Sequence, residues 1–417
     1  MILKNIIDKK WFKKATIVLV FLFAFSLPLH QKWSTFTLLI LVVISLVQKT
    51  NKTVLWTVPF LLPPLLYLIM AISLLYSEQM EFRYLEQRAS LIAFPIIFSI
   101  ARLTKREMFK ILEYFTWGCF LAIFVCYVNA FYNSLSLIDG ELVFKPVINE
   151  EFSFLYSVVR DGNYFFSSYF SIFHQSTYFA TYLNAAIAVI LAFSLWKKNK
   201  IYFFFLALFP LVIFQLSSKI SIVICGLIFI VYCIYRIKNI RYRGLFLILF
   251  FSITTLLIFI NPRSRIMIET ISERGLKIEP EERYGYNLRL MSWNAAISVI
   301  YKNPVFGVGI GDTQREINKV YKKKGYTQPL KENLNTHNQF LQTTIECGAL
   351  GLFMIILMLT LGFKQSKFNR DSGMAFLALI YFLIITMNFM FESFLNRYSG
   401  ISFFSFFYYL MITKSED

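Results

Sequence analysis

Three residues towards the end of the chain have types and a spacing that could do chemistry: Arg289, His337 and Glu346. His337 lies in the run Thr336-His-Asn-Gln339, which has the pattern of a capping box and predicts the histidine in the first turn of a helix. The positive end of a helix disfavours an imidazolium, so the ring is expected to be neutral and able to accept a proton. A surface histidine at a helix start is an alternative of equal weight.

Glu346 follows His337 inside an apolar run, about 13 Å further along a helix that rises about 1.5 Å per residue. A carboxylate at membrane depth is costly and indicates either a function or a buried partner. The two side chains are predicted on opposite faces of the helix, because the rotation between them is about two and a half turns. This favours a structural ion pair or hydrogen bond for Glu346.

The elements that must hold Arg289 can be predicted from the residues that follow it. Arg289 comes directly before an apolar stripe at helical spacing, which Pro304 ends and which consists of Leu290, Trp293, Ile297 and Ile300. A glycine-rich turn at 305–311 contains Gly307 and Gly309. The pattern is weak evidence for a nucleotide-binding loop, because no strand precedes it. We expect instead a turn that lets the backbone approach a bound head group. The run Thr313-Gln-Arg-Glu316 then predicts a capped helix that ends at Lys322-Lys-Lys-Gly325.

Three further side chains could bind an anion or a substrate. Lys219 lies between two apolar runs at their outer ends, where an ammonium either reaches the lipid head groups or binds an anion. His174 opens another apolar run from the outside. Arg283 lies in the polar segment shortly before Arg289.

The composition decides what kind of protein positions these residues. The chain has 417 residues, of which 57% are hydrophobic, 18% aromatic and 16% charged, and its mean hydropathy is +0.58. A soluble domain contains about 45–50% apolar and about 25% charged residues. The sequence therefore predicts an all-α polytopic membrane protein. Its five cysteines all lie in apolar runs without a Cys-x-x-Cys spacing, which argues against disulfides and against a metal site.

About twelve runs approach the roughly 20 apolar residues that cross a bilayer as a helix. They lie near 15–30, 33–48, 54–76, 89–103, 111–133, 174–196, 201–217, 218–235, 244–260, 338–363, 373–391 and 398–413. Lysine and arginine in the short loops indicate the orientation. With both termini in the cytoplasm, the inner segments carry 22 of the 42 basic residues. The net charge of +18 therefore reflects topology and argues against nucleic-acid binding.

Two long segments then lie outside the membrane, at 134–173 and 261–337. The remaining chain is poor in loops, so residues 1–417 are predicted to form a single integral membrane domain. The segment 261–337 contains thirteen basic and eight acidic residues. An anionic ligand would account for this excess, and so would a solvated surface of mixed charge. Outer loops on a rigid scaffold commonly carry binding or chemistry.

The order and spacing of these motifs resemble the O-antigen ligase and polymerase superfamily. The similar stretches are Arg289-Leu-Met-Ser-Trp293, Asn303-Pro-Val-Phe-Gly-Val-Gly309, His337-Asn-Gln-Phe-Leu341 and Glu346-Cys-Gly-Ala-Leu-Gly351. Leu216-Ser-Ser-Lys-Ile220 lies where the family has a Thr/Ser-x-Ser-Arg element, and His174-Gln-Ser-Thr-Tyr178 is similar to the start of a middle span. Glu392-Ser-Phe-Leu-Asn-Arg397 resembles the closing motif of Bacteroidetes-type members.

The resemblance implies a metal-independent, inverting glycosyltransferase without a cofactor, at the periplasmic face of the bacterial inner membrane. The donor would be a glycan on undecaprenyl pyrophosphate, and the acceptor a glycolipid, a glycan or a protein. His337 would be the general base, and Arg289 would hold the pyrophosphate. Substrate binding is assigned to Lys219, Arg283 and His174, and supporting structural positions to Glu346, Trp293, Gly307 and Gly309.

Several functions remain open at this point. The single dominant outer loop favours an O-antigen ligase, with lipid A–core as the acceptor, over a polymerase or a protein O-oligosaccharyltransferase. A transporter or flippase of the same lipid-linked sugar is the alternative from another class. It is disfavoured because the charged and glycine-rich features lie on the outer side instead of the bilayer midplane, and because no inverted repeat is visible.

Overall fold

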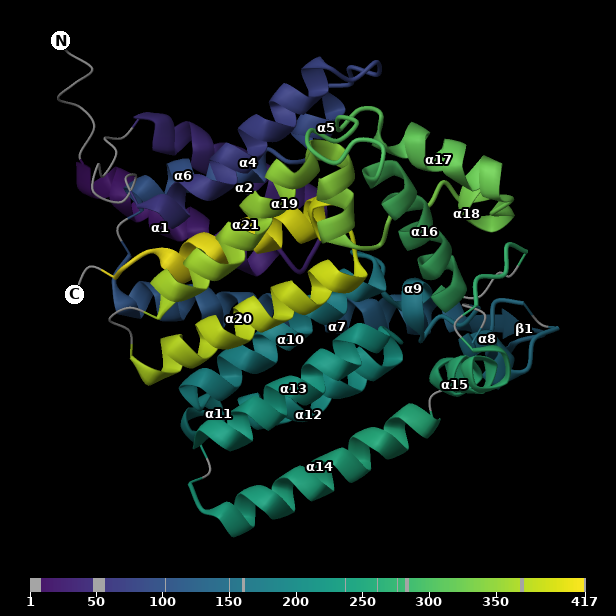
Figure 1. Ribbon diagram of the computed structural model, residues 1–417. Coiled ribbons are helices and arrows are strands. Elements are labelled where there is room, and N and C mark those ends of the chain that lie inside the picture. The colour runs from purple at the N-terminus through teal and green to yellow at the C-terminus, as the bar shows by residue number, and fades with distance from the viewer. Residues whose placement is uncertain are drawn as a thin grey trace. The chain divides into compact units, whose positions relative to one another are not determined.

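The structure, a computed structural model, is mainly helical and contains a small two-stranded sheet (Figure 1). It describes residues 9–47, 57–101, 103–149, 151–159, 162–236, 238–260, 262–275, 277–281, 285–367 and 371–415. These residues divide into two compact units. The first comprises the described residues of 1–20, 36–108 and 276–417, and the second those of 21–35 and 109–275. The single integral membrane domain expected from the sequence stays a prediction.

The elements are distributed over the two units as follows. Helices α1 (Lys9–Ser26), α2 (Gln31–Val47) and α7 (Lys105–Ser134) contribute residues to both. The first unit contains α4 (Val58–Leu75), α5 (Arg83–Glu86), α6 (Ser90–Ile100), α16 (Gly285–Ile300), α17 (Thr313–Lys324), α18 (Thr327–Lys331), α19 (Gln339–Ser366), α20 (Ser372–Phe391), the 3-10 helix η2 (Phe394–Asn396) and α21 (Tyr398–Ile412). The second contains β1 (Leu135–Ile138), β2 (Glu141–Phe144), α8 (Phe154–Val159), α9 (Ser167–Phe170), α10 (Ser176–Phe193), α11 (Leu195–Lys198), α12 (Ile201–Gln215), α13 (Lys219–Arg236), α14 (Ile240–Ile260) and α15 (Pro262–Arg274).

A helix occupies each of the twelve predicted spans: α1, α2, α4, α6, α7, α10, α12, α13, α14, α19, α20 and α21. In the part of the chain that the structure describes, six of them are long and apolar enough to cross a membrane, namely α4, α7, α10, α13, α19 and α20. Helices α2, α12 and α21 are shorter apolar helices. The all-α polytopic class is confirmed, and the number of spans stays a prediction.

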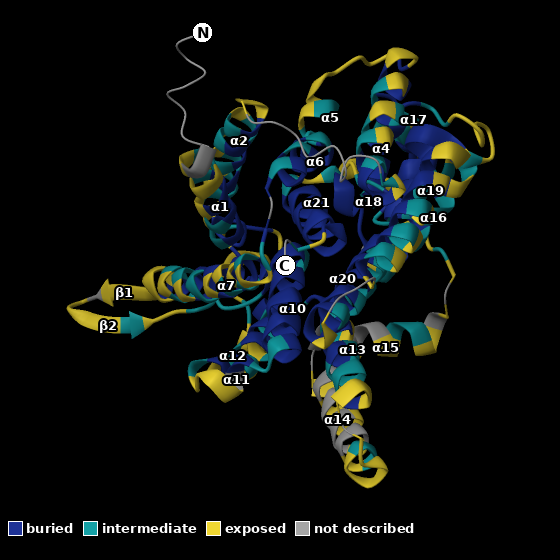
Figure 2. Ribbon diagram, turned by 90° about the vertical axis from the view of Figure 1, so that its left-hand side faces the viewer, coloured by how far each residue is buried: buried dark blue, intermediate teal, exposed yellow. Residues whose placement is uncertain are grey.

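Two helices form the buried centres of their units, as Figure 2 shows by their colour. In the first unit, α21 is buried along its length. The hydroxyls of its Tyr408 and Tyr409 donate hydrogen bonds of 2.9 Å to the carbonyl oxygens of Pro59 and Phe60, respectively, on α4. Buried tyrosines need such acceptors. In the second unit, α10 is buried along its length and packs against α12 and α13. The hairpin β1–β2 begins the predicted outer segment 134–173.

Helix α19 is broken at Gly348, whose backbone has φ 64° and ψ −159°. The break is closed by the glycine-rich turn: the amides of Val308 and Gly309 donate to the carbonyl oxygens of Ile345 and Glu346 at 2.8 and 3.1 Å. The amide of Ala349 donates to Pro304 at 2.9 Å. The span predicted as one helix at 338–363 is therefore two helical segments, 339–347 and 349–366, joined at a glycine.

Replacing this glycine should damage the fold. A Cβ at position 348 would lie 2.0 Å from the carbonyl oxygen of Val305, and the φ is left-handed. Gly348→Ala should lower the free energy of unfolding by about 3 kcal/mol or more, because strain and a backbone clash add. Thermal unfolding of the detergent-solubilised protein measures the loss. Gly325→Ala is the matched control, since Gly325 has φ 70° but open space around it, and an equal loss in both variants would contradict the clash.

Candidate functional site

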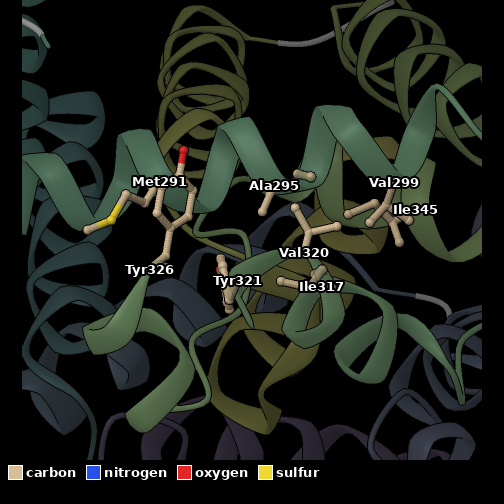
Figure 3. Packing of buried hydrophobic residues seen from close by; sticks show 9 residues of the cluster. Met291, Ala295, Val299, Ile317, Val320, Tyr321, Tyr326 and Ile345 are labelled. Atoms are coloured by element: carbon tan, nitrogen blue, oxygen red, sulfur yellow. The ribbon is translucent and has the colours of Figure 1, made fainter. Parts of the chain in front are cut away.

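Helix α16 is anchored by a compact hydrophobic cluster in the first unit (Figure 3). Its buried members include Met291, Ala295 and Val299 of α16 and, from its neighbours, Ile317, Val320, Tyr321, Tyr326 and Ile345. The apolar stripe noted in the sequence only borders this buried face, since Ile300 packs against the cluster whereas Ile297 is 44% exposed. The helix was predicted correctly. This packing fixes the direction in which α16 presents Arg289 and Trp293.

The glycine-rich turn is packed against α4 and does not present open backbone. The amides of Ile310 and Gly311 donate to the hydroxyls of Ser73 and Ser77, both at 3.2 Å. A Cβ on Gly309 would lie 2.2 Å from Ser77 Oγ, and one on Gly307 would lie 2.4 Å from the carbonyl oxygen of Ile345. Both glycines are therefore packed closely against the protein on the sides where a Cβ would lie. Their supporting structural role and the approach of a head group to this turn stay predictions.

The predicted capping box at Thr313-Gln-Arg-Glu316 is also wrong in detail. Helix α17 has Asp312 as its N-cap, without a side-chain capping bond. Instead, the Asp312 carboxylate accepts the backbone amides of Glu78 and Gln79 at 2.8 and 3.1 Å, and so ties the loop after α4 to α17. The helix ends, as predicted, after three lysines at the left-handed Gly325.

His337 precedes α19 and does not lie in its first turn. The N-cap is Asn338, whose Oδ1 accepts the amide of Leu341 at 3.0 Å. His337 has a left-handed φ of 45°, which is uncommon for a residue with a side chain. Its amide donates to Asn335 Oδ1 at 3.0 Å. The capping box predicted at 336–339 is therefore displaced, because Asn338 caps the helix in place of Thr336.

The partner of His337 is Glu392, which directly follows α20. Nδ1 of His337 lies 3.4 Å from both carboxylate oxygens of Glu392. The glutamate side chain is 5% exposed and the histidine side chain 24%. A carboxylate only accepts hydrogen bonds, so a hydrogen bond across this contact requires the ring hydrogen on Nδ1, which in a neutral ring leaves the lone pair on Nε2. The pair is a histidine oriented by a buried acid.

The charge of the same carboxylate also reaches Arg289. Burial lowers the pKa of the Arg289 guanidinium from its usual value, and the charge of Glu392 opposes this. A guanidinium stays protonated through such shifts. The structure thus brings together two of the predicted site residues, Arg289 and His337, around an acid that the sequence analysis did not select.

Trp293 lies one helical turn after Arg289 and carries an unused donor. Its Nε1 atom is buried, with no hydrogen-bond partner among the described residues. Its ring centroid is 6.4 Å from that of Phe391, the residue before Glu392. A buried donor without an acceptor costs about 1–3 kcal/mol, so such a group fits a site that a ligand oxygen fills.

Glu346 forms a buried ion pair with a residue from another part of the sequence. Nη2 of Arg88, between α5 and α6, donates to Glu346 Oε1 at 2.9 Å, and both side chains are 2% exposed. The same Nη2 donates to Asn396 Oδ1 at 2.8 Å, and Nη1 donates to the carbonyl oxygen of Tyr84 at 3.1 Å. Arg88 was not among the predicted site residues, although a lone arginine directly before an apolar run is a visible signal.

A chain of side chains runs from this ion pair to the loop that holds His337. Gln342 Nε2 donates to Glu346 Oε1 at 2.9 Å, and Gln342 Oε1 accepts the backbone amide of Thr336 at 3.4 Å and lies 3.1 Å from the Thr336 hydroxyl. The Thr336 and Ser393 hydroxyls are 3.1 Å apart. Ser393 also donates to Asn335 Oδ1 at 3.2 Å. Both residues that precede His337 are therefore held through their side chains.

The closing motif 392–397 joins the site to its supports. Glu392 contacts His337, Ser393 contacts Thr336 and Asn335, the amide of Leu395 donates to Gln339 Oε1 at 2.7 Å, and Asn396 accepts from Arg88. Four of its residues thus bind different parts of the first unit. The resemblance had singled out this motif without giving its members a role.

Two of the remaining predicted residues belong to the second unit. Lys219 is the first residue of α13 and half-buried, and His174 is 4% exposed before α10. Both belong to the second unit, so their arrangement with Arg289 and His337 stays a prediction. Arg283 lies outside the described residues. Burial lowers the pKa of His174 to about 4, although backbone groups at 27–29 partly oppose the shift.

His174 should make stability depend on pH. The unfolded chain takes up a proton near pH 6.5 and the folded one only near pH 4, so stability falls as the pH drops through that window. The full loss is about 3 kcal/mol below pH 4. Comparing the thermal unfolding of wild type and His174→Gln between pH 4 and pH 7 measures the difference. Parallel curves for the two proteins would contradict a buried neutral histidine.

The fold and site define a polytopic helical membrane protein with a histidine–acid pair and an arginine at one end of its helices. Residues 203–356 match the family model described as O-antigen ligase, a match that supports the O-antigen ligase superfamily and confirms the resemblance. Arg289, His337 and Glu346 lie inside the matched region, whereas Arg88 and Glu392 lie outside it. The family implies, in general, a glycosyltransferase-like enzyme that uses lipid-linked glycan and acceptor substrates in a bacterial membrane. The comparison with curated proteins gave no match.

Proposed function

We propose that this protein transfers a glycan from undecaprenyl pyrophosphate to an acceptor hydroxyl at the periplasmic face of the inner membrane, with lipid A–core as the acceptor. The observation that carries the proposal is the contact between His337 and the buried Glu392, whose charge also reaches the buried Arg289. A base and a phosphate-binding cation around one buried acid are what transfer from a pyrophosphate to a hydroxyl requires.

In the proposed reaction His337 is the general base. Its Nε2 takes the proton of the acceptor hydroxyl while the oxygen forms a bond to the anomeric carbon of the donor sugar. The bond from that carbon to the pyrophosphate oxygen breaks, and the leaving lipid pyrophosphate takes the electron pair. Attack opposite to the leaving group inverts the anomeric carbon, and no metal takes part. Glu392 on Nδ1 stabilises the imidazolium that forms.

Arg289 and Trp293 are proposed to hold the leaving group. The guanidinium can donate two parallel hydrogen bonds to phosphate oxygens. The unused Nε1 donor of Trp293 supports an oxygen-rich ligand beside it. Before the reaction the charges of Arg289 and Glu392 cancel. Protonation of His337 then adds one positive charge as negative charge develops on the departing oxygen, so the site stabilises the transition state more than the bound donor.

Further donor contacts by Lys219, Arg283 and His174 are proposed on the resemblance alone. Lys219 would take the place of the arginine that the family commonly has there, as a point charge instead of a planar fork. Burial of His174 favours a structural part for that residue.

The glycans of a deletion strain test the proposed function. A ligase predicts that long glycan chains disappear from lipid A–core while the same polymer accumulates on undecaprenyl pyrophosphate. Shortened chains that still reach lipid A would indicate a polymerase, and loss of glycoprotein would indicate a protein O-oligosaccharyltransferase. Unchanged lipopolysaccharide, polymer and glycoprotein would overturn the proposal.

The orientation can be tested separately with two exposed lysines. Lys323→Cys, at the end of α17, should react in intact cells with an impermeant thiol reagent that has passed the outer membrane. Lys238→Cys, between α13 and α14, should react only after the inner membrane is opened. The five natural cysteines are free but buried, which keeps the background low. Reversed labelling would exclude a periplasmic reaction.

A further inference from the structure

We propose that Arg88 is a positioning residue that sets the separation between His337 and Glu392. This inference rests on the proposed function, in which those two residues are the base and the acid that orients it. Arg88 does not contact them. It binds the far ends of the two segments that carry them.

The first path leads from Arg88 to the histidine. Arg88 donates to Glu346 at 2.9 Å, and Gln342 donates to the same carboxylate oxygen at 2.9 Å. Gln342 Oε1 in turn accepts the backbone amide of Thr336 at 3.4 Å and lies 3.1 Å from the Thr336 hydroxyl. Thr336 is the neighbour of His337 in the chain. Glu346 and Gln342 lie on the rigid segment of α19 before its break, so a displacement of Glu346 is passed to the loop.

The second path leads from Arg88 to the acid. The same Nη2 atom donates to Asn396 Oδ1 at 2.8 Å. Asn396 ends the short 3-10 helix η2, which begins two residues after Glu392. A single nitrogen atom therefore holds both segments, and its two hydrogen bonds fix how far apart they can lie.

The ion pair is poorly suited to a purely stabilising role. Both side chains are withdrawn from water, and replacing a buried ion pair by apolar residues of similar size is often neutral or stabilising. The pair is also incompletely satisfied, because Arg88 Nε and Glu346 Oε2 have no hydrogen-bond partner among the described residues. Holding two segments at a fixed distance explains why such a pair is present here, without any gain in stability.

The histidine needs outside support for its geometry. Its left-handed backbone is strained, and its 3.4 Å contact with Glu392 is longer than a typical charged hydrogen bond. A further displacement would break the contact, and a misplacement of about 1 Å can reduce a catalysed rate about a hundredfold.

The decisive experiment removes the ion pair without leaving a buried charge. Arg88→Met alone strands Glu346 and should unfold easily, whereas Arg88→Met with Glu346→Leu should keep wild-type thermal stability. Transfer of glycan from undecaprenyl pyrophosphate is then measured at varied donor concentration, with solubilised membranes of the deletion strain as the acceptor. The double variant should have kcat reduced about 10- to 100-fold and KM for the donor within about twofold of wild type. A wild-type kcat in the stable double variant would overturn the proposal.

Three further variants keep the result interpretable. Asn396→Ala leaves the ion pair intact and cuts only the second path, so kcat should fall about tenfold, and an unchanged kcat would refute that path. Arg315→Met is the matched control, because Arg315 lies in the same unit, pairs with the exposed Glu78 and should have wild-type kinetics. His337→Ala separates the two ideas. If it retains activity, the proposed base is wrong, whereas an inactive His337→Ala beside a normal double variant refutes the positioning role alone.

Discussion

His337→Ala should transfer glycan at least about a hundredfold more slowly than the wild type while it inserts into the membrane and unfolds at the same temperature. The reason is that the variant lacks the group that takes the acceptor proton, and a positioned base contributes about 10²–10⁴-fold. The measurement is the initial rate with undecaprenyl-pyrophosphate-linked glycan at saturating acceptor. The loss should appear in kcat, because the ring is proposed to act on the acceptor hydroxyl in the transition state.

His30→Ala is the matched control for this experiment. His30 is exposed in the turn between α1 and α2, where its Nδ1 accepts the amide of Lys32, so its removal should leave the rate unchanged. Glu392→Gln should give an intermediate loss of about tenfold or more, since it keeps a side chain at Nδ1 but removes the charge that stabilises the imidazolium. Near-normal transfer by the purified His337→Ala protein would remove this residue from the mechanism.

Arg289→Met should reduce kcat/KM for the lipid-linked donor by about 10²- to 10³-fold, the effect of removing a fixed donor that faces developing charge. Arg289→Lys should recover only part of this loss, because one ammonium cannot reproduce two parallel hydrogen bonds to phosphate oxygens. The apolar stem of methionine retains most of the packing around the helix. Donor concentration dependence measures both variants.

An exposed arginine serves as the control for Arg289. Arg265 on α15 forms an ion pair with Glu269 and is 70% exposed, so Arg265→Met should change the donor kinetics little. Full activity of Arg289→Lys would show that a point charge is enough and that bidentate binding is not required. Full activity of Arg289→Met would exclude the residue from donor binding.

The sequence was sufficient for the helices because their signal is local. Each predicted span is a continuous apolar run, and a helix lies in every one of them. The packed face of α16 was harder to predict, because both of its faces are apolar and exposed apolar side chains are ordinary in a protein that lies in a membrane. The predicted capping boxes were wrong because other residues precede the helices. The N-cap of α17 is Asp312, whose side chain binds the loop after α4, and α19 is capped by Asn338.

The candidate site was predictable only in part. Arg289 and His337 were found because each lies in a motif, and the structure places both near one acid. Arg88 and Glu346 are 258 residues apart, so no local pattern connects them. Glu392 was visible within a motif, but its contact with His337 depends on how the chain returns after α20. Pairing of this kind is decided by the tertiary fold.

The hydrogen bonds across the break in α19 also constrain the order in which this part of the protein can assemble. Ser73 and Ser77 are synthesised first, the turn that binds them second, and the segment that receives hydrogen bonds from the turn last. The turn can therefore dock on α4 as soon as it is made, but the amides of Val308 and Gly309 gain their acceptors only when α19 has been inserted. In the finished protein we expect these amides and that of Ala349 to open as one cooperative unit and to exchange their hydrogens with solvent together.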